Sequence, residues 1–436
     1  MNEYRKYKES GIEWIGEIPE DWNIKRLKNL ANQISKKSLE ILEEDFIVAL
    51  ENIESNTGKF IDTFSNYENN GIIFRKSNLL YNKLRPYLNK VYKAEKDGIC
   101  VGDIIVLECL NKLDPRFLQY KMLSDGFCSI VMSSVQGTKM PRTSWEFISS
   151  LKFGIPPFNE QQNISDYLDI QTQKIDQLIS NKKDQANKLK ELRQIEINNA
   201  VTKGLNPYAK MKDSGIEWLG EIPKHWEVKR VKDYGKVLGG FAFKSGVFLE
   251  EGNVMALKIT NVQTMQLVWD DIEFLPDDYY QQYQEYSLQN GDLVFALTRP
   301  VISTGIKAAI AFISKKDKIL INQRTGVFKH SKELVTELLY FIVLSDYFFQ
   351  DFNLRIKTTN QPNISTEEIS RIKLVLPPRL EQLEIAHFLQ KRTDFFDKLI
   401  RNLEAQIEKL QELRKIKIYE AVTGKIKVNS YAETTA

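Results

Sequence analysis

The side chains best suited to metal binding or nucleophilic catalysis in this sequence are few, and their spacing argues against both roles. They are Cys100, Cys109, Cys128, His225, His330 and His387. No two cysteines form a Cys-x-x-Cys pair, the spacing typical of zinc and redox sites, and no histidine accompanies a recognisable cysteine or serine motif. We therefore expect three reduced, mostly buried cysteines, no metal site and no catalytic residue in this chain.

Three short segments are similar to parts of enzyme motifs, but each is incomplete. Residues 206–208, Asn-Pro-Tyr, lack the second proline of the Asn-Pro-Pro-Tyr loop of adenine methyltransferases, and no glycine-rich cofactor motif precedes them. Residues 235–240 lack the Gly-Lys-Ser/Thr of a phosphate loop, and residues 276–278 lack a Glu-x-Lys partner for a nuclease site. We expect no cofactor to bind this chain itself.

The composition is that of a folded protein with several domains. The chain has 436 residues, of which 42% are hydrophobic and 27% charged, with a net charge of +3. This charge is too small to indicate nucleic-acid binding by itself, although it permits local basic faces. The N-terminus is charged, and apolar runs such as residues 338–344 are too short to cross a bilayer. We expect a cytoplasmic protein without a membrane partner.

An internal repeat is the strongest signal in the sequence. Residues 8–30 read KESGIEWIGEIPEDWNIKRLKNL, and residues 212–234 read KDSGIEWLGEIPKHWEVKRVKDY. A second repeat closes each half, and its anchors keep their spacing without any gap. Pro-Pro with Glu-Gln at 156–161 recurs at 377–382, Glu-Leu-Arg at 191–193 recurs at 412–414, and Ala-Val-Thr at 200–202 recurs at 421–423.

The closing segments of the two halves are predicted to be long helices. Each follows a proline pair, contains no helix breaker and ends near a glycine, Gly204 or Gly424. Their apolar residues recur at three- and four-residue spacing, which indicates an antiparallel coiled-coil spacer. The predicted seam includes Ile164, Leu168, Ile175, Leu178, Leu189, Leu192, Ile385, Leu389, Phe396, Leu399, Leu403, Leu410 and Leu413. The alternative, one amphipathic helix lying on each domain, is less favoured because globular helices average about 11 to 12 residues.

The two interiors contain short β-rich runs followed by helical patterns, for example at 102–107 and 292–297. Each interior is predicted to be a mixed α/β domain. The two interior sequences align poorly with each other, so the repeated motifs of the two halves enclose different sequences. The predicted fold is α/β, with two domains separated by the two helices in a pseudo-two-fold repeat. The predicted segments are 1–155, 156–205, 206–376 and 377–427, followed by a disordered tail at 428–436.

These repeated motifs, together with Gly-Gly-Phe-Ala-Phe-Lys-Ser at 239–245, resemble the specificity subunit of type I restriction–modification systems. The resemblance covers nearly the whole chain. It implies two target recognition domains, each reading one half of a split site in double-stranded DNA. It also implies that two adenine-N6 methyltransferase (modification) subunits and motor-nuclease (restriction) subunits dock on the helices. S-adenosylmethionine, ATP and Mg would then belong to those partners.

The side chains expected to contact DNA lie in polar loops that are matched between the two halves, 133–142 with 357–363 and 83–87 with 298–300. Arginine and lysine can bind guanine or phosphate, and asparagine and glutamine can bind adenine. The candidate DNA-binding residues are Lys83, Arg85, Gln136, Thr138, Lys139, Arg142, Lys244, Arg299, Lys357, Thr359, Asn360, Gln361 and Asn363. The candidate partner-docking residues are Glu160, Gln161, Arg193, Glu381, Gln382 and Arg414.

Three other interpretations stay open from the sequence. The chain could be a complete enzyme with a degenerate catalytic site, which the incomplete motifs disfavour. It could be a scaffold whose domains bind protein, or a DNA-binding adaptor that has no nuclease partner.

Overall fold

The computed structural model describes residues 4–38, 42, 45–63, 70–110, 112–135, 140–357 and 360–428. The chain divides into two compact units, one made of Met1–Asp184 with Glu404–Ala436 and the other of Gln185–Leu403. Helices α4 (Phe158–Lys203) and α9 (Arg379–Val422) therefore contribute residues to both units, instead of forming segments of their own. The expected mixed α/β fold with two long helices is confirmed. The tail predicted to be disordered lies, except for Val428, outside the described residues.

Unit 1 is built on a four-stranded antiparallel sheet in the order β4-β10-β7-β8. These strands are β4 (Ala31–Ile34), β10 (Ile104–Cys109), β7 (Leu79–Asn82) and β8 (Val91–Lys93). A smaller sheet contains β5 (Ile47–Val48), β9 (Gly98–Cys100) and β6 (Ile72–Phe74). The remaining strands and helices are β1 (Tyr7–Glu9), β2 (Glu17–Pro19), β3 (Asn23–Arg26), α1 (Pro115–Leu123), α2 (Asp125–Ser133), α3 (Trp145–Ser150) and β11 (Lys152–Ile155).

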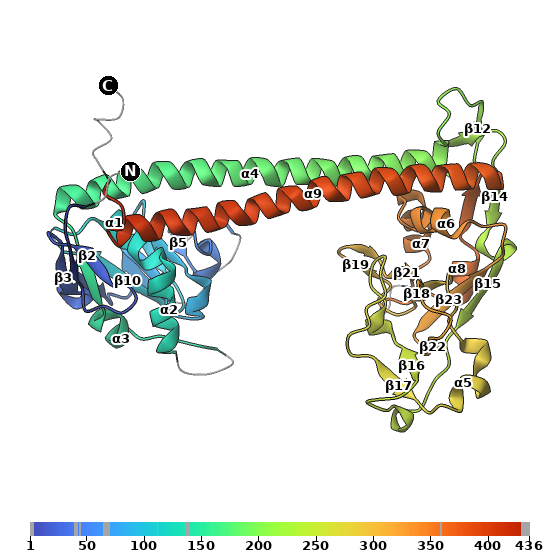
Figure 1. The fold of residues 1–436 in the computed structure, drawn as a ribbon, viewed down its shortest axis with the longest axis horizontal. Coiled ribbons are helices and arrows are strands. Elements are labelled where there is room, and N and C mark those ends of the chain that lie inside the picture. Colours follow the sequence, from blue (N-terminus) through green and yellow to red (C-terminus); the bar gives the residue numbers. More distant parts are fainter. Residues whose placement is uncertain are drawn as a thin grey trace. The chain divides into compact units, whose positions relative to one another are not determined.

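Unit 2 repeats this architecture although its interior sequence differs. Its four-stranded sheet has the order β15-β23-β18-β21, from β15 (Gly235–Gly239), β23 (Thr325–His330), β18 (Leu293–Ala296) and β21 (Ala308–Ile310). The smaller sheet contains β17 (Glu273–Leu275), β16 (Val254–Leu257) and β22 (Lys318–Ile321). The other elements are β12 (Met211–Asp213), β13 (Glu221–Pro223), β14 (Glu227–Arg230), α5 (Tyr279–Gln282), β19 (Val301–Ile302), β20 (Gly305–Ile306), α6 (Thr336–Val343), α7 (Asp346–Leu354), α8 (Thr366–Ser370) and β24 (Lys373–Leu376). In Figure 1, α6 and α7 lie between α9 and the strands of this unit.

The smaller sheets differ between the units. Both contain one parallel pair, β5 with β9 in unit 1 and β16 with β22 in unit 2. The third strand pairs with the later strand of that pair in unit 1 and with the earlier strand in unit 2. The interior sequences, which differ between the halves, therefore give different strand pairings in the smaller sheets, whereas the four-stranded sheets have equivalent strand orders.

Each unit builds its core from the beginning of one long helix and the end of the other. In unit 1 the α4 residues Ile164 and Leu168 pack with Ile418 and Val422 of α9. In unit 2 the roles are exchanged, because Ile197 and Val201 near the end of α4 pack with Ile385 and Leu389 near the start of α9. Within each unit the two helix segments are therefore antiparallel, as predicted.

Equivalent ion pairs join the helices in each unit. Arg414 Nε lies 3.0 Å from Asp176 Oδ1 in unit 1, and Arg193 Nε lies 3.2 Å from Asp397 Oδ1 in unit 2. These two arginines were expected to dock a partner, but their guanidinium groups face the other helix, and Arg414 is only 6% exposed.

The predicted seam is wrong at three leucines, Leu178, Leu192 and Leu413, which are 48%, 50% and 40% exposed. Successive residues of an α-helix point about 100° apart. Because Arg193 and Arg414 face inward, the leucine that precedes each of them turns outward. The apolar spacing identified the helices correctly but not the side that faces the partner helix.

Lys121 on α1 is fully buried without a carboxylate partner within hydrogen-bond distance among the described residues. Its ammonium donates hydrogen bonds to the carbonyl oxygens of Val422, at 2.6 Å, and Gly154, at 3.3 Å. Burial lowers the pKa of Lys121 from 10.5 to about 7. The residue at the equivalent place on α6 is Ile342, so only unit 1 has a buried amine at this position.

Replacing Lys121 with Met should stabilise the protein at neutral pH. The pKa gap corresponds to a destabilisation of up to about 5 kcal/mol, offset by two hydrogen bonds worth about 1 kcal/mol each. Between pH 7 and 10.5 the unfolded state binds more protons than the folded state, so wild-type stability rises with pH across that window. The difference in Tm between Lys121→Met and wild type should therefore shrink as the pH rises from 7 to 9.5. An exposed-lysine control, Lys236→Met, should give a small difference that does not change with pH, and the same behaviour in Lys121→Met would contradict the expectation.

Candidate nucleic-acid interface

A buried tryptophan joins the repeated motifs in each unit. The indole Nε1 of Trp22 donates to Glu160 Oε1 at 3.2 Å, and that of Trp226 donates to Glu381 Oε1 at 3.1 Å. Both tryptophans are fully buried. We call each Trp–Glu pair, with the helix end that packs on it, the tryptophan joint of its unit.

A glycine at the end of a long helix completes each tryptophan joint. Gly424 lies against Trp22, and Gly204 lies against Trp226, so that a Cβ atom at either glycine would come within 3.2 Å of the ring. Both glycines have a left-handed backbone, with φ of +73° and +72°. Glycine is therefore favoured at each position for two reasons, the left-handed backbone conformation and the close approach to the indole ring.

The residues after the two glutamates are also internal. Gln161 Oε1 accepts a hydrogen bond from the Asp114 backbone at 2.9 Å, and Gln382 Oε1 accepts one from the Val335 backbone at 3.0 Å. The glutamines are 1% and 4% exposed. The expectation that Gln161 and Gln382 dock a partner is therefore wrong, because their amides hold α1 and α6 onto the long helices. Glu160 and Glu381 were also expected to dock a partner, but their carboxylates accept the indole hydrogen bonds of Trp22 and Trp226.

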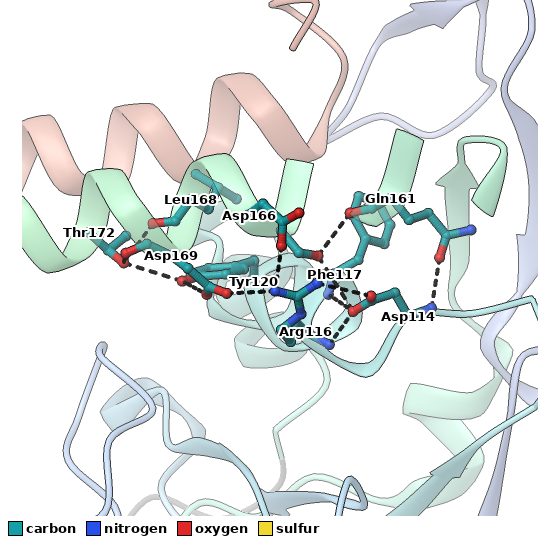
Figure 2. A network of polar contacts seen from close by, with 10 residues as sticks. Asp114, Arg116, Phe117, Tyr120, Gln161, Asp166, Leu168, Asp169 and Thr172 are labelled. Atoms are coloured by element: carbon teal, nitrogen blue, oxygen red, sulfur yellow. Dashed lines mark hydrogen bonds and ion pairs between the residues drawn. The ribbon is translucent and has the colours of Figure 1, made fainter. Parts of the chain in front are cut away.

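In unit 1 a polar network extends this attachment along α4 (Figure 2). Arg116 Nη1 lies 2.7 Å from Asp166 and 2.9 Å from Asp169. The Tyr120 hydroxyl donates to Asp169 at 2.7 Å, and burial together with this carboxylate raises the pKa of Tyr120. Helix α1, and the sheet it covers, is thereby held in a fixed position on α4.

The loops expected to contact DNA come together beyond the end of β7 in unit 1. Leu84 and Arg142 form a β-bridge, and the backbone amide of Arg85 donates to the Pro141 carbonyl at 2.8 Å. The amide of Thr143 donates to the Lys83 carbonyl at 3.1 Å. We call residues 83–86 and 140–143 tip 1.

Unit 2 has the same arrangement. Thr298 and Asn363 form a β-bridge, and the backbone amide of Arg299 donates to the Pro362 carbonyl at 2.7 Å. The amide of Ile364 donates to the Leu297 carbonyl at 2.9 Å. We call residues 297–300, 357 and 360–364 tip 2. The loops that the sequence matched between the two halves thus occupy equivalent positions in the two units, and the contact between the two loops of each unit is a finding of the structure.

Each tip contains an exposed arginine in a left-handed backbone conformation. Arg85 has φ +51° and Arg299 has φ +48°, and each is followed by a buried proline. This conformation is unfavourable for residues other than glycine, and it recurs in functional sites where the surrounding structure enforces it. The same strained arginine in two units with different sequences points to a shared use of its side chain.

The remaining candidates are divided between the tips, other places and the undescribed part of the chain. Lys357 exchanges backbone hydrogen bonds with Asn363 in tip 2, where Asn360 and Gln361 are exposed. Lys244 is exposed, but it follows Phe243, which packs with the smaller sheet of unit 2. Gln136, Thr138, Lys139 and Thr359 lie outside the described residues.

Asp103 belongs to tip 1 by contact, although the sequence did not single it out. Its carboxylate lies 2.8 Å from Arg142 Nη2 and 3.5 Å from Lys83 Nζ. The nearby Glu146, at the start of α3, has its pKa lowered chiefly by hydrogen bonds from its own backbone amide and from Ser144. In tip 1, therefore, the Asp103 carboxylate pairs with the basic side chains of both loops, Arg142 and Lys83.

Among the residues with described positions, no group of histidine, cysteine, aspartate and glutamate side chains is arranged to hold a metal ion. Nor does any helix in the described ranges combine the length and apolar character needed to cross a membrane.

A family model described as the type I restriction modification DNA specificity domain matches residues 19–188 and 223–409. The chain is 29% identical over 420 residues to the type I restriction enzyme MjaVIII specificity subunit of Methanocaldococcus jannaschii, covering 95% of each chain. It is 34% identical over 163 residues to the EcoAI specificity subunit of Escherichia coli, covering 37% of this chain and 27% of that one.

Solved structures with the same fold come from the same kind of system. A chain from a structure on the complex assembly and conformational transition of a type I R-M system has a TM-score of 0.70 at 15% identity, covering 94% of this chain and 99% of that one. The HsdS subunit from Thermoanaerobacter tengcongensis has a TM-score of 0.50 at 16% identity, covering 94% and 98%. At these identities the likeness concerns the fold alone.

The left-handed conformation of Arg299 predicts an unusual order of stability among variants. Arg299→Gly should be more stable than Arg299→Ala by about 1 kcal/mol, because only glycine adopts this φ without strain. Denaturant unfolding of both variants measures the difference. At an exposed position of ordinary φ, such as Lys236, the order should reverse, since glycine costs about 0.5–1 kcal/mol relative to alanine within regular structure. Equal stability of the two Arg299 variants would show that the strain is absent.

Proposed function

This chain belongs to the type I restriction–modification DNA specificity family, and on that premise we propose that each unit reads one half of a split double-stranded DNA site. The chain is a specificity subunit, a non-catalytic member of its enzyme complex. The observation that carries the proposal is the pair of tips, which share a backbone frame but differ in side chains. A common frame with different polar side chains suits two modules that bind the same duplex and read different bases.

The side chains of the tips have the chemistry that base and phosphate recognition needs. Arg85 and Arg142 in tip 1 can each donate two hydrogen bonds to guanine or bind phosphate. Tip 2 offers Arg299 together with the exposed amides of Asn360 and Gln361, and an amide can bond adenine through two atoms.

We further propose that two modification subunits dock on the long helices through exposed apolar pairs. Leu192 and Ile195 are 50% and 53% exposed in unit 2, and their repeat equivalents Leu413 and Ile416 are 40% and 43% exposed in unit 1. Exposed apolar groups of this kind are typical of protein interfaces. Two equivalent patches would accommodate two copies of one subunit. S-adenosylmethionine, ATP and Mg would act in the modification and restriction subunits, and the complex would work in the cytoplasm.

Removing the strained arginine from one tip should affect only the half-site of that unit. In the complex with its modification subunit, Arg85→Gly should reduce base discrimination in one half of the methylated site, and Arg299→Gly in the other. The loss of one two-bond contact costs about 1 to 3 kcal/mol. Glycine suits the backbone at both positions, so misfolding would not explain a loss. Sequencing of methylated sites is the measurement. The chain without its modification subunit should methylate nothing. Equal damage to both halves by either variant would exclude separate reading.

Charges placed in one apolar patch should release one modification subunit. The double variant Leu192→Glu, Ile195→Glu should shift the complex from two modification subunits to one, and so should Leu413→Glu, Ile416→Glu, because a carboxylate is costly to bury in an interface. Native mass spectrometry measures the stoichiometry. Leu354→Glu, at a 69% exposed position on α7, is the matched control and should leave it unchanged. Two subunits in either double variant would place the docking surface elsewhere.

A further inference from the structure

The residue that precedes β10 in unit 1 occupies the same place as the residue that precedes β23 in unit 2. The amide of Lys83 donates to the Asp103 carbonyl at 2.9 Å, and the amide of Leu297 donates to the Arg324 carbonyl at 2.9 Å. Lys83 and Leu297 are themselves equivalent, because the backbone carbonyl of Lys83 accepts from the amide of Thr143 in tip 1 and that of Leu297 accepts from the amide of Ile364 in tip 2. The shared backbone therefore places Asp103 and Arg324 beside tip 1 and tip 2, respectively.

The two residues have opposite charges at this equivalent position. In tip 1 the Asp103 carboxylate bonds Arg142 at 2.8 Å and lies 3.5 Å from Lys83. In tip 2 the corresponding neighbours are Asn363 and Leu297, and Arg324 is exposed. One tip thus contains a cation held by a carboxylate, and the other has a further guanidinium in place of that carboxylate.

We propose that this position determines the base preference of each half-site, with Asp103 as a positioning residue and Arg324 as a direct contact to DNA. The inference rests on the proposed function. Asp103 is 24% exposed at its side chain, whereas Arg142 is 57% exposed, so the carboxylate sits behind the guanidinium and leaves its outer edge open. A planar guanidinium held on one side presents its remaining N–H groups in a fixed direction, as two-bond recognition of a base requires.

A neutral side chain at position 103 distinguishes two possible roles of Asp103, which are holding the Arg142 guanidinium in place and repelling DNA by its negative charge. Asp103→Asn removes one negative charge beside the DNA, so affinity for random duplex should rise while discrimination in the first half-site falls, by about 5- to 150-fold if the contact of Arg142 is lost. A role limited to charge would raise affinity without changing discrimination. In an Arg142→Ala background, Asp103→Asn should cause no further loss, because the residue acts through Arg142. Asp103→Glu, which keeps the carboxylate, should retain part of the discrimination.

Arg324→Gln should act on the other half-site only. Discrimination in the second half should fall within the same range of fold-change, and affinity for random duplex should weaken because a positive charge is lost. Matched controls remove one charge from the same sheets at the far end of the strands. They are Glu108→Gln on β10 in unit 1 and Lys236→Gln on β15 in unit 2, both exposed.

The experiment measures methylation of a library of sites, varied one base at a time, by the complex with its modification subunit. Half-specific changes for Asp103→Asn and Arg324→Gln, with silent controls, support the inference. It is overturned if both variants behave as their controls while Arg85→Gly and Arg299→Gly remain half-specific, an outcome that leaves the proposed function intact. If the arginine-to-glycine variants also lack half-specific effects, the proposed function fails and the inference with it.

Discussion

A buried indole N–H must find an acceptor, and in each unit that requirement is met by a glutamate at the start of a long helix. An unpaired buried donor costs about 1 to 3 kcal/mol. Trp22 and Trp226 therefore tie the N-terminal motif of each repeat to the Pro-Pro…Glu-Gln motif that closes an interior. The helix end that packs on the same ring comes from the other repeat, with a glycine at the contact. Three of the four repeated motifs meet at the tryptophan joint, and the fourth, Glu-Leu-Arg, supplies the arginine that pairs with the other helix. These contacts explain why the motifs recur while the residues between them differ.

The joints and the tips make different demands on the chain. At the joint a side chain is surrounded on every side, so its size, polarity and backbone conformation are all constrained. At the tip the shared constraint falls mainly on the backbone, through hydrogen bonds to Pro141 and Pro362. Side chains there can change without loss of the frame, as the contrast between Asp103 and Arg324 illustrates. A scaffold of this kind permits different side chains at the tips without a new fold.

The two units also differ inside, at Lys121 and Ile342. The amine of Lys121 bonds the last turn of α9 through the Val422 carbonyl, yet its burial costs free energy that an aliphatic side chain at the same place avoids. In unit 1 the N-terminal repeat motif contacts the end of α9, where Gly424 lies against Trp22. The buried amine gives that contact a directional bond, which apolar packing of Ile342 in unit 2 does not provide.

The sequence by itself determined the two halves, the long helices to within about five residues at each end, the matching of the polar loops between the halves and the family. These follow from local periodicity and from repeated motifs, which do not depend on what lies nearby in space. Tertiary structure decided which face of each helix is buried. It turned Leu192 outward and Arg193 inward, and it placed Gln161 in the interior instead of on a docking surface. It also brought Asp103 to tip 1, because a single carboxylate before a strand has no sequence pattern that reveals its neighbours. Contacts between distant segments depend on how the sheet aligns its strands, and that alignment exists only in the folded chain.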